Sequence, residues 1–315
     1  MQTFIRVVEV WTPDETGQQL ELNGGMYGDL DDFAEYSMRE KFEIGEGLPG
    51  RAWKQAKPVV QKAFKPTIFN RTEAAHKVGL TSGIAIPIFA AEQLKAVVVF
   101  LCGDNEKLAG AIEVWCNDGL SGLALVDGYY GDLERFEWLS KQIRFPRGRG
   151  LPGMAWEANQ ATILGNLNAS NSFLRSRAAD DAGITTGIAI PINSNEVTED
   201  DDIGSVVTFL SSKSTPIAKR FEVWAPDEAG EKLQFKAGIV QDCPDLEDYD
   251  PNYSIEMGDG VIGQSWQTGL PVTSSDLTNN AIPERHSEYK EEFKSLLAIP
   301  VYFQNNLKSI VAFYN

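Results

Sequence analysis

Cysteine and histidine are scarce in this chain. Its 315 residues include three cysteines, Cys102, Cys116 and Cys243, and two histidines, His76 and His286. Three cysteines do not make a disulfide framework in a chain of this size, and no spacing among these residues matches a structural zinc site. The sequence therefore predicts a cytoplasmic protein without a metal site, and it identifies no cofactor.

Positive charge and long apolar runs are also in short supply. Lys and Arg number 28 against 45 Asp and Glu, which gives a formal net charge of −17. Such a charge repels a nucleic-acid backbone and an anionic membrane surface. No apolar stretch approaches the roughly 18 residues of a membrane span. We therefore expect neither nucleic acid nor membrane as a partner.

What the sequence does contain is internal repetition. A glycine-rich run occupies residues 45–53 and 148–156 and returns in looser form at 258–266. Its corresponding glycines lie 103 and 110 residues apart. This period is too long for a solenoid repeat and suits a small independent domain. The predicted units are residues 1–105, 106–214 and 215–315.

Three further landmarks keep the same order in every copy. Each unit opens with Glu-Val-Trp, later contains an Ala-Ile-Pro run, and closes on an apolar run that ends in Phe. These landmarks begin at Glu9, Glu113 and Glu222, at Ile84, Ile188 and Leu297, and at Val97, Val206 and Ile310. The chain therefore repeats one fold three times.

The order of elements within a unit predicts an α+β fold. In the first unit we expect strands over residues 4–11 and 19–22, a helix over 50–56, a second helix beginning at Thr72, and closing strands over 83–89 and 96–102. Hairpins at both ends imply a mainly antiparallel sheet, with the short helices on one of its faces.

The glycine motif has two physical interpretations. Gly45 and Gly47 permit backbone angles that other residues avoid, Pro49 suits a first helical turn, and Gly50 allows the helix to approach the sheet closely. A helix amino terminus after glycines can instead bind a phosphate. Because the Lys-Ser/Thr pair of a P-loop and the dinucleotide-binding pattern are both missing, we favour packing over nucleotide binding.

On these motifs each unit resembles a GAF domain of the kind found in bacterial signalling proteins. The resemblance rests on residues 45–53 with 79–87 and on 148–156 with 183–191, and the third unit is more divergent. It implies a profilin-like or PAS-like sandwich with a cavity between the sheet and the helices. Family members bind cyclic nucleotides, tetrapyrroles, haem, small metabolites or only each other, so the fold alone does not define the function.

The resemblance implies a sensory or regulatory protein, not an enzyme, that binds a small-molecule ligand or a signalling protein. The alternative is a structural or assembly protein whose cavities are filled by side chains and which oligomerises through its sheet faces. The resemblance places ligand-contacting groups between the third strand and the second helix, although asparagine and aspartate there also serve as ordinary turn and cap residues. These candidates are Phe69, Asn70, Arg71, Asn166, Asn168, Asn171, Phe173, Arg175, Asp276 and Asn279, and a separate anion site is predicted at Arg144, Arg147 and Arg149.

One enzymatic branch of the family reduces free methionine sulfoxide with cysteines placed over the cavity. A hairpin about Glu106 would pair Cys102 with a residue near position 110, well away from Cys116. Cys243 lies among carboxylates that should raise its thiol pKa. A thiol-dependent reductase is therefore the weakest of the three hypotheses.

The joins between units are too short for the long terminal helices that usually cover the back of a GAF sheet. Only eight residues, 103–110, separate the last strand of the first unit from the first strand of the second. Exposed apolar sheet faces would cause aggregation. We therefore expect the sheet backs to pack together within the chain or against a second copy, and strand exchange between units is left open.

Overall fold

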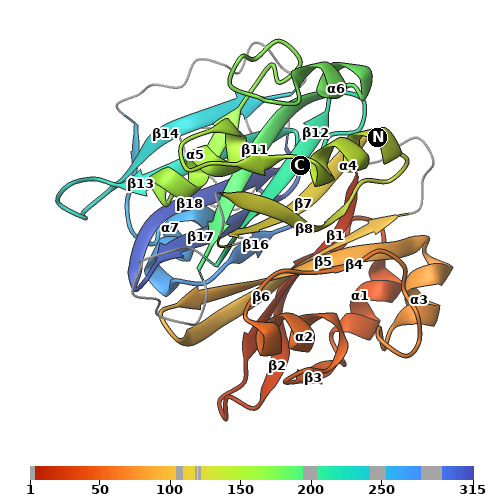
Figure 1. Cartoon of the computed structure of the whole chain (residues 1–315). Coiled ribbons are helices and arrows are strands. Elements are labelled where there is room, and N and C mark those ends of the chain that lie inside the picture. Colours follow the sequence, from red (N-terminus) through yellow and green to blue (C-terminus); the bar gives the residue numbers. More distant parts are fainter. Residues whose placement is uncertain are drawn as a thin grey trace.

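The computed structural model describes residues 4–103, 109–117, 119, 122–193, 204–241, 253–277 and 293–315. These residues form three six-stranded antiparallel sheets with short helices, which confirms the expected α+β fold (Figure 1). The prediction of Cys102 beside position 110 is wrong, because the strand that carries Cys102 pairs only with two strands of its own unit. Every described strand stays in the sheet of its own repeat.

The elements follow the same order in each unit. Unit 1 has β1 (Ile5–Pro13), β2 (Gln19–Met26), α1 (Asp31–Ser37), β3 (Lys41–Glu43), α2 (Gly47–Gln55), β4 (Val59–Gln61), α3 (Thr72–Lys77), β5 (Leu80–Ala90) and β6 (Gln93–Gly103). Unit 2 has β7 (Gly110–Asn117), β8 (Leu123–Tyr129), α4 (Glu134–Lys141), β9 (Arg144–Phe145), α5 (Gly150–Ala158), β10 (Thr162–Leu164), α6 (Ser176–Asp181), β11 (Ile184–Ile192) and β12 (Ser205–Ser212). Unit 3 has β13 (Arg220–Pro226), β14 (Leu233–Val240), β15 (Ser254–Ile255), α7 (Gly260–Thr268), β16 (Val272–Ser274), β17 (Leu296–Phe303) and β18 (Asn306–Tyr314).

The strand order is also shared. It runs β3-β2-β1-β6-β5-β4 in unit 1, and the other two sheets repeat this order with their own strands. The first and last long strands of each unit are therefore neighbours at the middle of its sheet. A short connection from β6 to β7 can then lead directly from one sheet into the next.

The glycine motif packs a helix against a sheet edge. Gly45 and Gly47 have φ values of 90° and 56°, where a side chain is strained. A Cβ atom on Gly50 would lie 2.1 Å from the carbonyl oxygen of Glu43 in β3, and the corresponding glycines of units 2 and 3 are equally confined. The helix begins at Gly47, three residues earlier than expected, so Pro49 lies within its first turn.

The backs of the three sheets form one shared apolar core. At its centre lie Phe100, Phe209 and Phe313, each of which ends the closing apolar run of its repeat. The ring centroid of Phe100 is 5.1 Å from that of Phe209 and 6.0 Å from that of Phe313, and the other two are 5.4 Å apart. The sheet backs are thus covered within the chain, without a second copy.

The Ala-Ile-Pro landmark alternates between the shared core and a core on the helix side of each sheet. In unit 1, Ile84 and Ile86 face the shared core and Ala85 faces the helices. The prolines Pro87, Pro191 and Pro300 line a central space of about 10 Å³ where the three units meet. This volume holds at most a single water molecule, so it offers no ligand site.

The three units close into a ring with approximate threefold symmetry. The outer strand of each unit packs against the second strand of the next: β4 against β8, β10 against β14, and β16 against β2. We call each of these contacts a corner. Figure 1 shows unit 1 in red to orange, unit 2 in yellow to green and unit 3 in blue around the shared core.

Candidate functional site

A buried glutamate occupies the space between sheet and helices in every unit. Glu9, Glu113 and Glu222 come from the Glu-Val-Trp landmark, and each is 0% exposed. Glutamate and tryptophan are two residues apart in a strand, so both face the helices, while the intervening valine faces the shared core. The tryptophan Nε1 donates to its glutamate in all three units, over 3.0, 3.1 and 2.9 Å.

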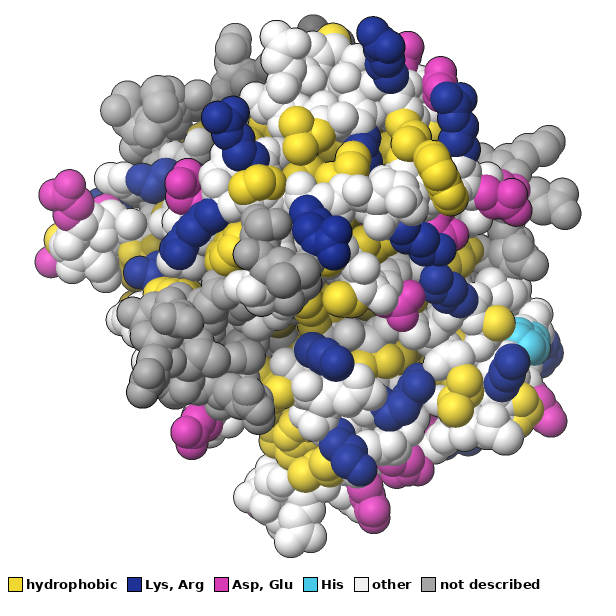
Figure 2. Space-filling view, in the orientation of Figure 1, with side chains coloured by type: hydrophobic (Ala, Val, Ile, Leu, Met, Phe, Trp, Pro, Cys, Tyr) yellow, Lys and Arg dark blue, Asp and Glu magenta, His cyan; other side chains and the backbone are white. Residues whose placement is uncertain are grey.

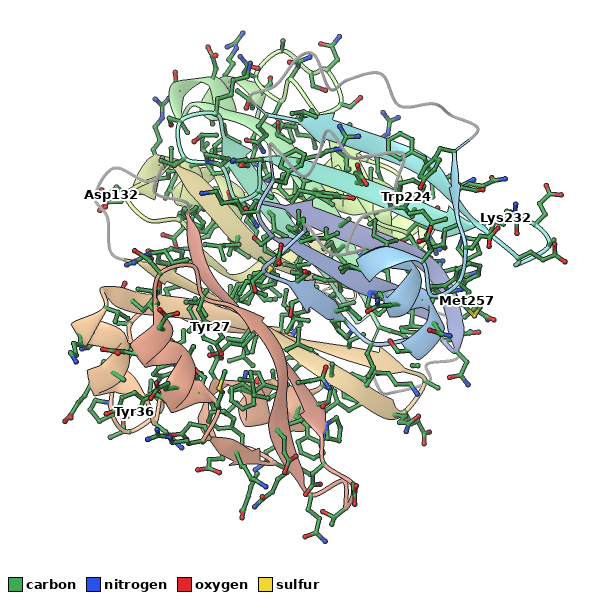
Figure 3. All side chains as sticks on the ribbon, turned by 180° about the vertical axis from the view of Figure 1, so that it is seen from behind. Tyr27, Tyr36, Asp132, Trp224, Lys232 and Met257 are labelled. Atoms are coloured by element: carbon green, nitrogen blue, oxygen red, sulfur yellow. The ribbon has the colours of Figure 1, made fainter. Side chains whose placement is uncertain are left out.

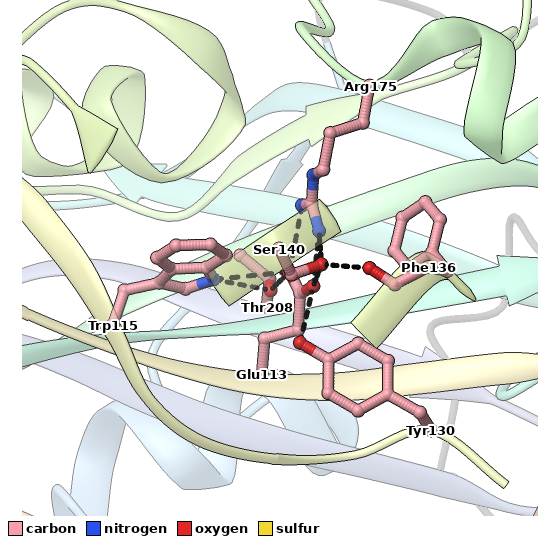
Figure 4. Close-up of polar contacts among 7 residues, drawn as sticks. All are labelled: Glu113, Trp115, Tyr130, Phe136, Ser140, Arg175 and Thr208. Atoms are coloured by element: carbon pink, nitrogen blue, oxygen red, sulfur yellow. Dashed lines mark hydrogen bonds and ion pairs between the residues drawn. The ribbon is translucent and has the colours of Figure 1, made fainter. Parts of the chain in front are cut away.

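In unit 2 an arginine binds this glutamate through two nitrogens (Figure 4). Arg175 Nη1 donates to Glu113 Oε1, and Arg175 Nη2 donates to Oε2 over 2.9 Å. The remaining donors to the carboxylate are Ser140 at 3.0 Å, Tyr130 at 3.0 Å, Thr208 at 2.9 Å and Trp115 at 3.1 Å. Both charges are therefore compensated inside the unit.

Unit 1 repeats the arrangement with one difference. Arg71 Nη2 donates to Glu9 Oε2 over 2.8 Å, and Ser37 and Tyr27 donate to Oε1 over 2.8 and 3.2 Å. The strand position that holds Thr208 in unit 2 holds Val99 here, because these two residues pair with Glu113 and Glu9 respectively. The unit 1 carboxylate consequently lacks that hydroxyl donor.

Aromatic rings surround each of these arginines. The guanidinium of Arg175 lies 4.6–5.6 Å from the centroids of four rings, and that of Arg71 lies 5.0–5.8 Å from four more. The rings are Trp115, Phe136, Phe145 and Phe173 in unit 2 and Trp11, Phe33, Phe42 and Phe69 in unit 1. Ring faces attract a cation, so the space favours a guanidinium as well as excluding water. The Nε atom of each arginine is buried and has no hydrogen-bond partner in the described structure.

The pairing determines the ionisation of the buried carboxyls. Burial alone raises the pKa of Glu9, but the charge and hydrogen bonds of Arg71 outweigh it, so the pKa lies below its usual value. The pKa of Glu113 is lowered in the same way: burial raises it, and the charge and hydrogen bonds of Arg175 outweigh burial. Burial and the nearby Glu9 charge raise the pKa of Tyr27. The carboxyls of Glu9 and Glu113 are therefore ionised at neutral pH, and Tyr27 donates its hydrogen bond as a neutral phenol.

Unit 3 compensates its glutamate by another route. Arg220 lies two residues before Glu222 on the same strand and donates through Nε to Oε1 over 2.5 Å. Trp224, labelled in Figure 3, and Tyr314 donate to Oε2 over 2.9 and 3.0 Å. Units 1 and 2 hold Val7 and Ala111 at the position of Arg220. The unit 3 segment that corresponds to the Arg71 region lies outside the described residues.

The predicted ligand residues divide into two groups. Four are buried in the two arginine sites: Phe69, Arg71, Phe173 and Arg175. The others that can be described are exposed: Asn70, Asn166, Asn168, Asn171 and Asp276. Asn70 Nδ2 donates to Glu46 and Asn168 Nδ2 donates to Asp180, which is local loop chemistry. Asn279 lies outside the described residues.

The arginines predicted as an anion site are exposed side chains beside α5. Arg144 belongs to β9, Arg149 immediately precedes α5, and Arg147 lies over the ring of Trp156 with its Cζ atom 5.7 Å from the centroid. Figure 2 shows lysines and arginines distributed singly over the visible face, between acidic and apolar side chains.

The described cysteines are poorly suited to thiolate chemistry. Cys102 is buried in the shared core, and burial raises its pKa. Burial also raises the pKa of Cys116, although the charge of Lys57 opposes this. Cys243 lies outside the described residues.

Within the described ranges no group of three or more potential ligands is placed to hold a metal ion, and no helix is long and apolar enough to cross a membrane.

Sequence reasoning missed the glutamates, although a signal was present. A glutamate recurs at the same place in three mainly apolar strands, and the tryptophan two residues after it lies on the same face of each strand. A charge repeated on the core face of a strand indicates a buried partner. That partner is 62 residues away in units 1 and 2, so the strand itself does not reveal it.

No protein-family model matches the chain, and no curated protein matches it in sequence. Among solved structures, the GAF domain of an Acinetobacter phosphoenolpyruvate-protein phosphotransferase is 16% identical over 31% of this chain and 55% of its own, with a TM-score of 0.25. Free methionine-R-sulfoxide reductase from Neisseria meningitidis is 18% identical over 31% and 52%, with a TM-score of 0.25. A mutated NreA protein from Staphylococcus aureus is 16% identical over 32% and 74%, with a TM-score of 0.27.

Each of these matches covers about one unit of this chain, and the first two span about half of the matched protein. The three six-stranded antiparallel sheets with short helices match the α+β architecture that the sequence motifs predicted.

Proposed function

We propose that this chain is a regulatory protein without catalytic activity that binds another protein, and that the sheet–helix spaces of units 1 and 2 do not hold a small ligand. The observation that carries the proposal is the pairing of Glu9 with Arg71 and of Glu113 with Arg175 inside those spaces. The residues best suited to attract a charged ligand already bind each other.

A ligand would have to separate each pair to enter. The side chains of Arg71 and Arg175 are only 1% exposed, and those of their glutamates are 0% exposed. Breaking a buried pair by removing one partner costs about 3–5 kcal/mol. The contacts of a ligand would have to offset that free energy before any net affinity remained. The filled spaces therefore favour a structural role for both sites.

The absence of catalysis is part of the same proposal. The Cys102 thiol lies in the shared core, away from the helix-side spaces, and burial raises the pKa of both described thiols. A raised pKa leaves little thiolate at neutral pH. The described sheet backs already pack on one another, so they leave no sheet face free for oligomerisation.

Native mass spectrometry of the full chain, purified from its own host, tests the proposal. We expect the mass of the polypeptide without a stoichiometric small molecule. A bound compound that is lost in both Glu9→Gln and Glu113→Gln, but retained in the exposed control Glu35→Gln, would overturn it. Reduction of free methionine sulfoxide is the enzymatic check, and any turnover that disappears when all three cysteines become serine would also contradict the proposal.

A further inference from the structure

The corner between units 1 and 2 is closed by ion pairs. Lys62, the first residue after β4, places its Nζ 3.4 Å from Asp127 Oδ1 on β8 and 3.3 Å from Glu137 Oε1 on α4. One lysine thus connects the outer edge of unit 1 to both the second strand and the first helix of unit 2.

The corner between units 3 and 1 has lost all three of these groups. The residue after β16 is Ser275 in place of Lys62. Gly24 takes the place of Asp127, since they pair with the matching valines Val10 and Val114. Ala34 takes the place of Glu137, since each follows the buried phenylalanine of its helix.

A groove of about 770 Å³ lies at this corner. Its walls include Gly24, Gly25, Ala34 and Met38 of unit 1 and Ser275 and Lys294 of unit 3. Pockets of 300–1,000 Å³ are of the size that ligands use. The groove thus lies at a corner where the Lys62-type bridge is missing.

The corner between units 2 and 3 is closed differently again. Gly165 follows β10 at the position of Lys62, and a Cβ atom on it would lie 2.5 Å from Cδ1 of Ile239 on β14. Apolar contact fills this corner. The three corners are thus an ionic one, an apolar one and a grooved one.

The groove runs beside an unpaired strand edge. On the side away from β1, β2 pairs with β3 only at residues 19–21, and no described strand pairs with residues 22–26 there. Five residues of strand extend about 17 Å. Gly24 and Gly25 carry no side chains here, and the space that a Cβ atom would take is filled by Thr273 of β16 and by the Tyr27 ring, so an added strand could reach this stretch only along its outer edge. A strand edge that no described strand pairs with is a template for an added strand.

The charges beside the edge indicate what kind of strand fits. Asp29 and Asp31 line the groove on the side of unit 1, against the single Lys294 of unit 3. The whole chain carries −17, which disfavours a second copy as the occupant. A basic segment meets no such repulsion.

We propose that the groove between units 1 and 3 binds an extended, basic segment of a partner protein, which adds a strand to residues 22–26 of β2. The inference rests on the proposed function, because it locates the partner-binding site of the same protein. Asp29 and Asp31 attract the basic side chains, and the free edge of β2 supplies the backbone hydrogen bonds.

The test uses the full chain and a displayed library of random 12-residue peptides. We expect the enriched peptides to be basic and to slow amide hydrogen exchange at residues 22–26. Asp29→Lys with Asp31→Lys, both exposed, should weaken binding at least tenfold. Ala34→Glu with Ser275→Lys, which restores two of the bridging groups, should do the same, and its melting temperature shows whether it is folded.

The matched control is Lys62→Ser with Glu137→Ala at the other corner, which should leave peptide binding unchanged. Failure to enrich any peptide, protection away from residues 22–26, or equal affinity for the charge-reversed variant would overturn the assignment. These outcomes are distinct from failure of the proposed function, which would appear as a small molecule bound to the purified chain.

Discussion

In units 1 and 2 the arginine that binds the buried glutamate immediately precedes α3 or α6. In unit 3 the arginine is Arg220 on the opening strand. The glutamate and its tryptophan are the same in all three units. The arginine is required for its charge, and its place in the sequence is free to change. Neutralisation of the glutamate is therefore the feature that the three repeats share.

Removal of a single arginine should give the largest effect. Arg175→Met or Arg71→Met leaves a buried carboxylate without its counterion, which costs about 3–5 kcal/mol. Urea unfolding followed by tryptophan fluorescence measures the loss. If Arg220→Met in unit 3 costs as much, the two routes are equivalent; a loss below about 1 kcal/mol in all three variants would contradict the importance of neutralisation.

Acid should weaken units 1 and 2 through the same glutamates. Their folded pKa values lie below the ordinary 4.5, so the unfolded chain binds protons first as the pH falls. The stability that these glutamates contribute is complete above about pH 4.5 and is lost as the pH falls through their folded pKa values. Between the unfolded and folded pKa values, each glutamate loses about 1.4 kcal/mol per pH unit.

Unfolding measured between pH 7 and pH 3 tests this expectation, with Glu113→Gln as the comparison. The variant should show a shallower loss of stability below pH 4.5 than the parent chain. An identical acid profile in both would mean that Glu113 keeps an ordinary pKa when folded.

Thr208 should distinguish unit 2 from unit 1 by a smaller amount. Thr208→Val removes the hydroxyl donor to Glu113 and reproduces the valine that unit 1 has at position 99, so we expect a loss of about 1 kcal/mol. The reverse change, Val99→Thr, offers Glu9 an extra donor. Thermal unfolding of both variants measures the difference, and a stabilised Thr208→Val protein would show that the hydroxyl is not used.

Replacing both partners at once should have the smallest net effect. Glu113→Leu with Arg175→Met fills the space with apolar groups of similar size, and such exchanges of buried ion pairs are often neutral or stabilising. The double variant should therefore recover most of the stability that Arg175→Met loses. A double variant as unstable as the single one would indicate that the cage of rings requires a cation.

The repeated landmarks were sufficient to predict the fold because each marks a local packing requirement. The glycine run produces a helix start and a close contact, and the Ala-Ile-Pro run produces strand alternation, both within a few residues. The short joins also predicted that the sheet backs would be covered, and the shared core covers them within the chain. The segment between β2 and the glycine motif, for which no element was predicted, forms α1 and β3.

The site was less accessible from the sequence because its contacts are distant along the chain. Arg71 and Arg175 were predicted as ligand-contacting residues because the resemblance places their segment beside the cavity. Nothing near them in the sequence identifies Glu9 and Glu113 as their partners. The groove was even harder to predict from the sequence, because it depends on which residues of two different units meet. The significance of Ser275, Gly24 and Ala34 is evident only when this corner is compared with the ion-paired corner.

The threefold arrangement within one chain has a consequence for stoichiometry. A trimer of identical single units would present three identical corners and so bind three partners or none. Here the fusion lets each corner diverge: one is ionic, one is apolar and one carries the groove. Among the described corners, the proposed binding groove occurs once, so under that proposal one chain holds one partner segment and does not link several together.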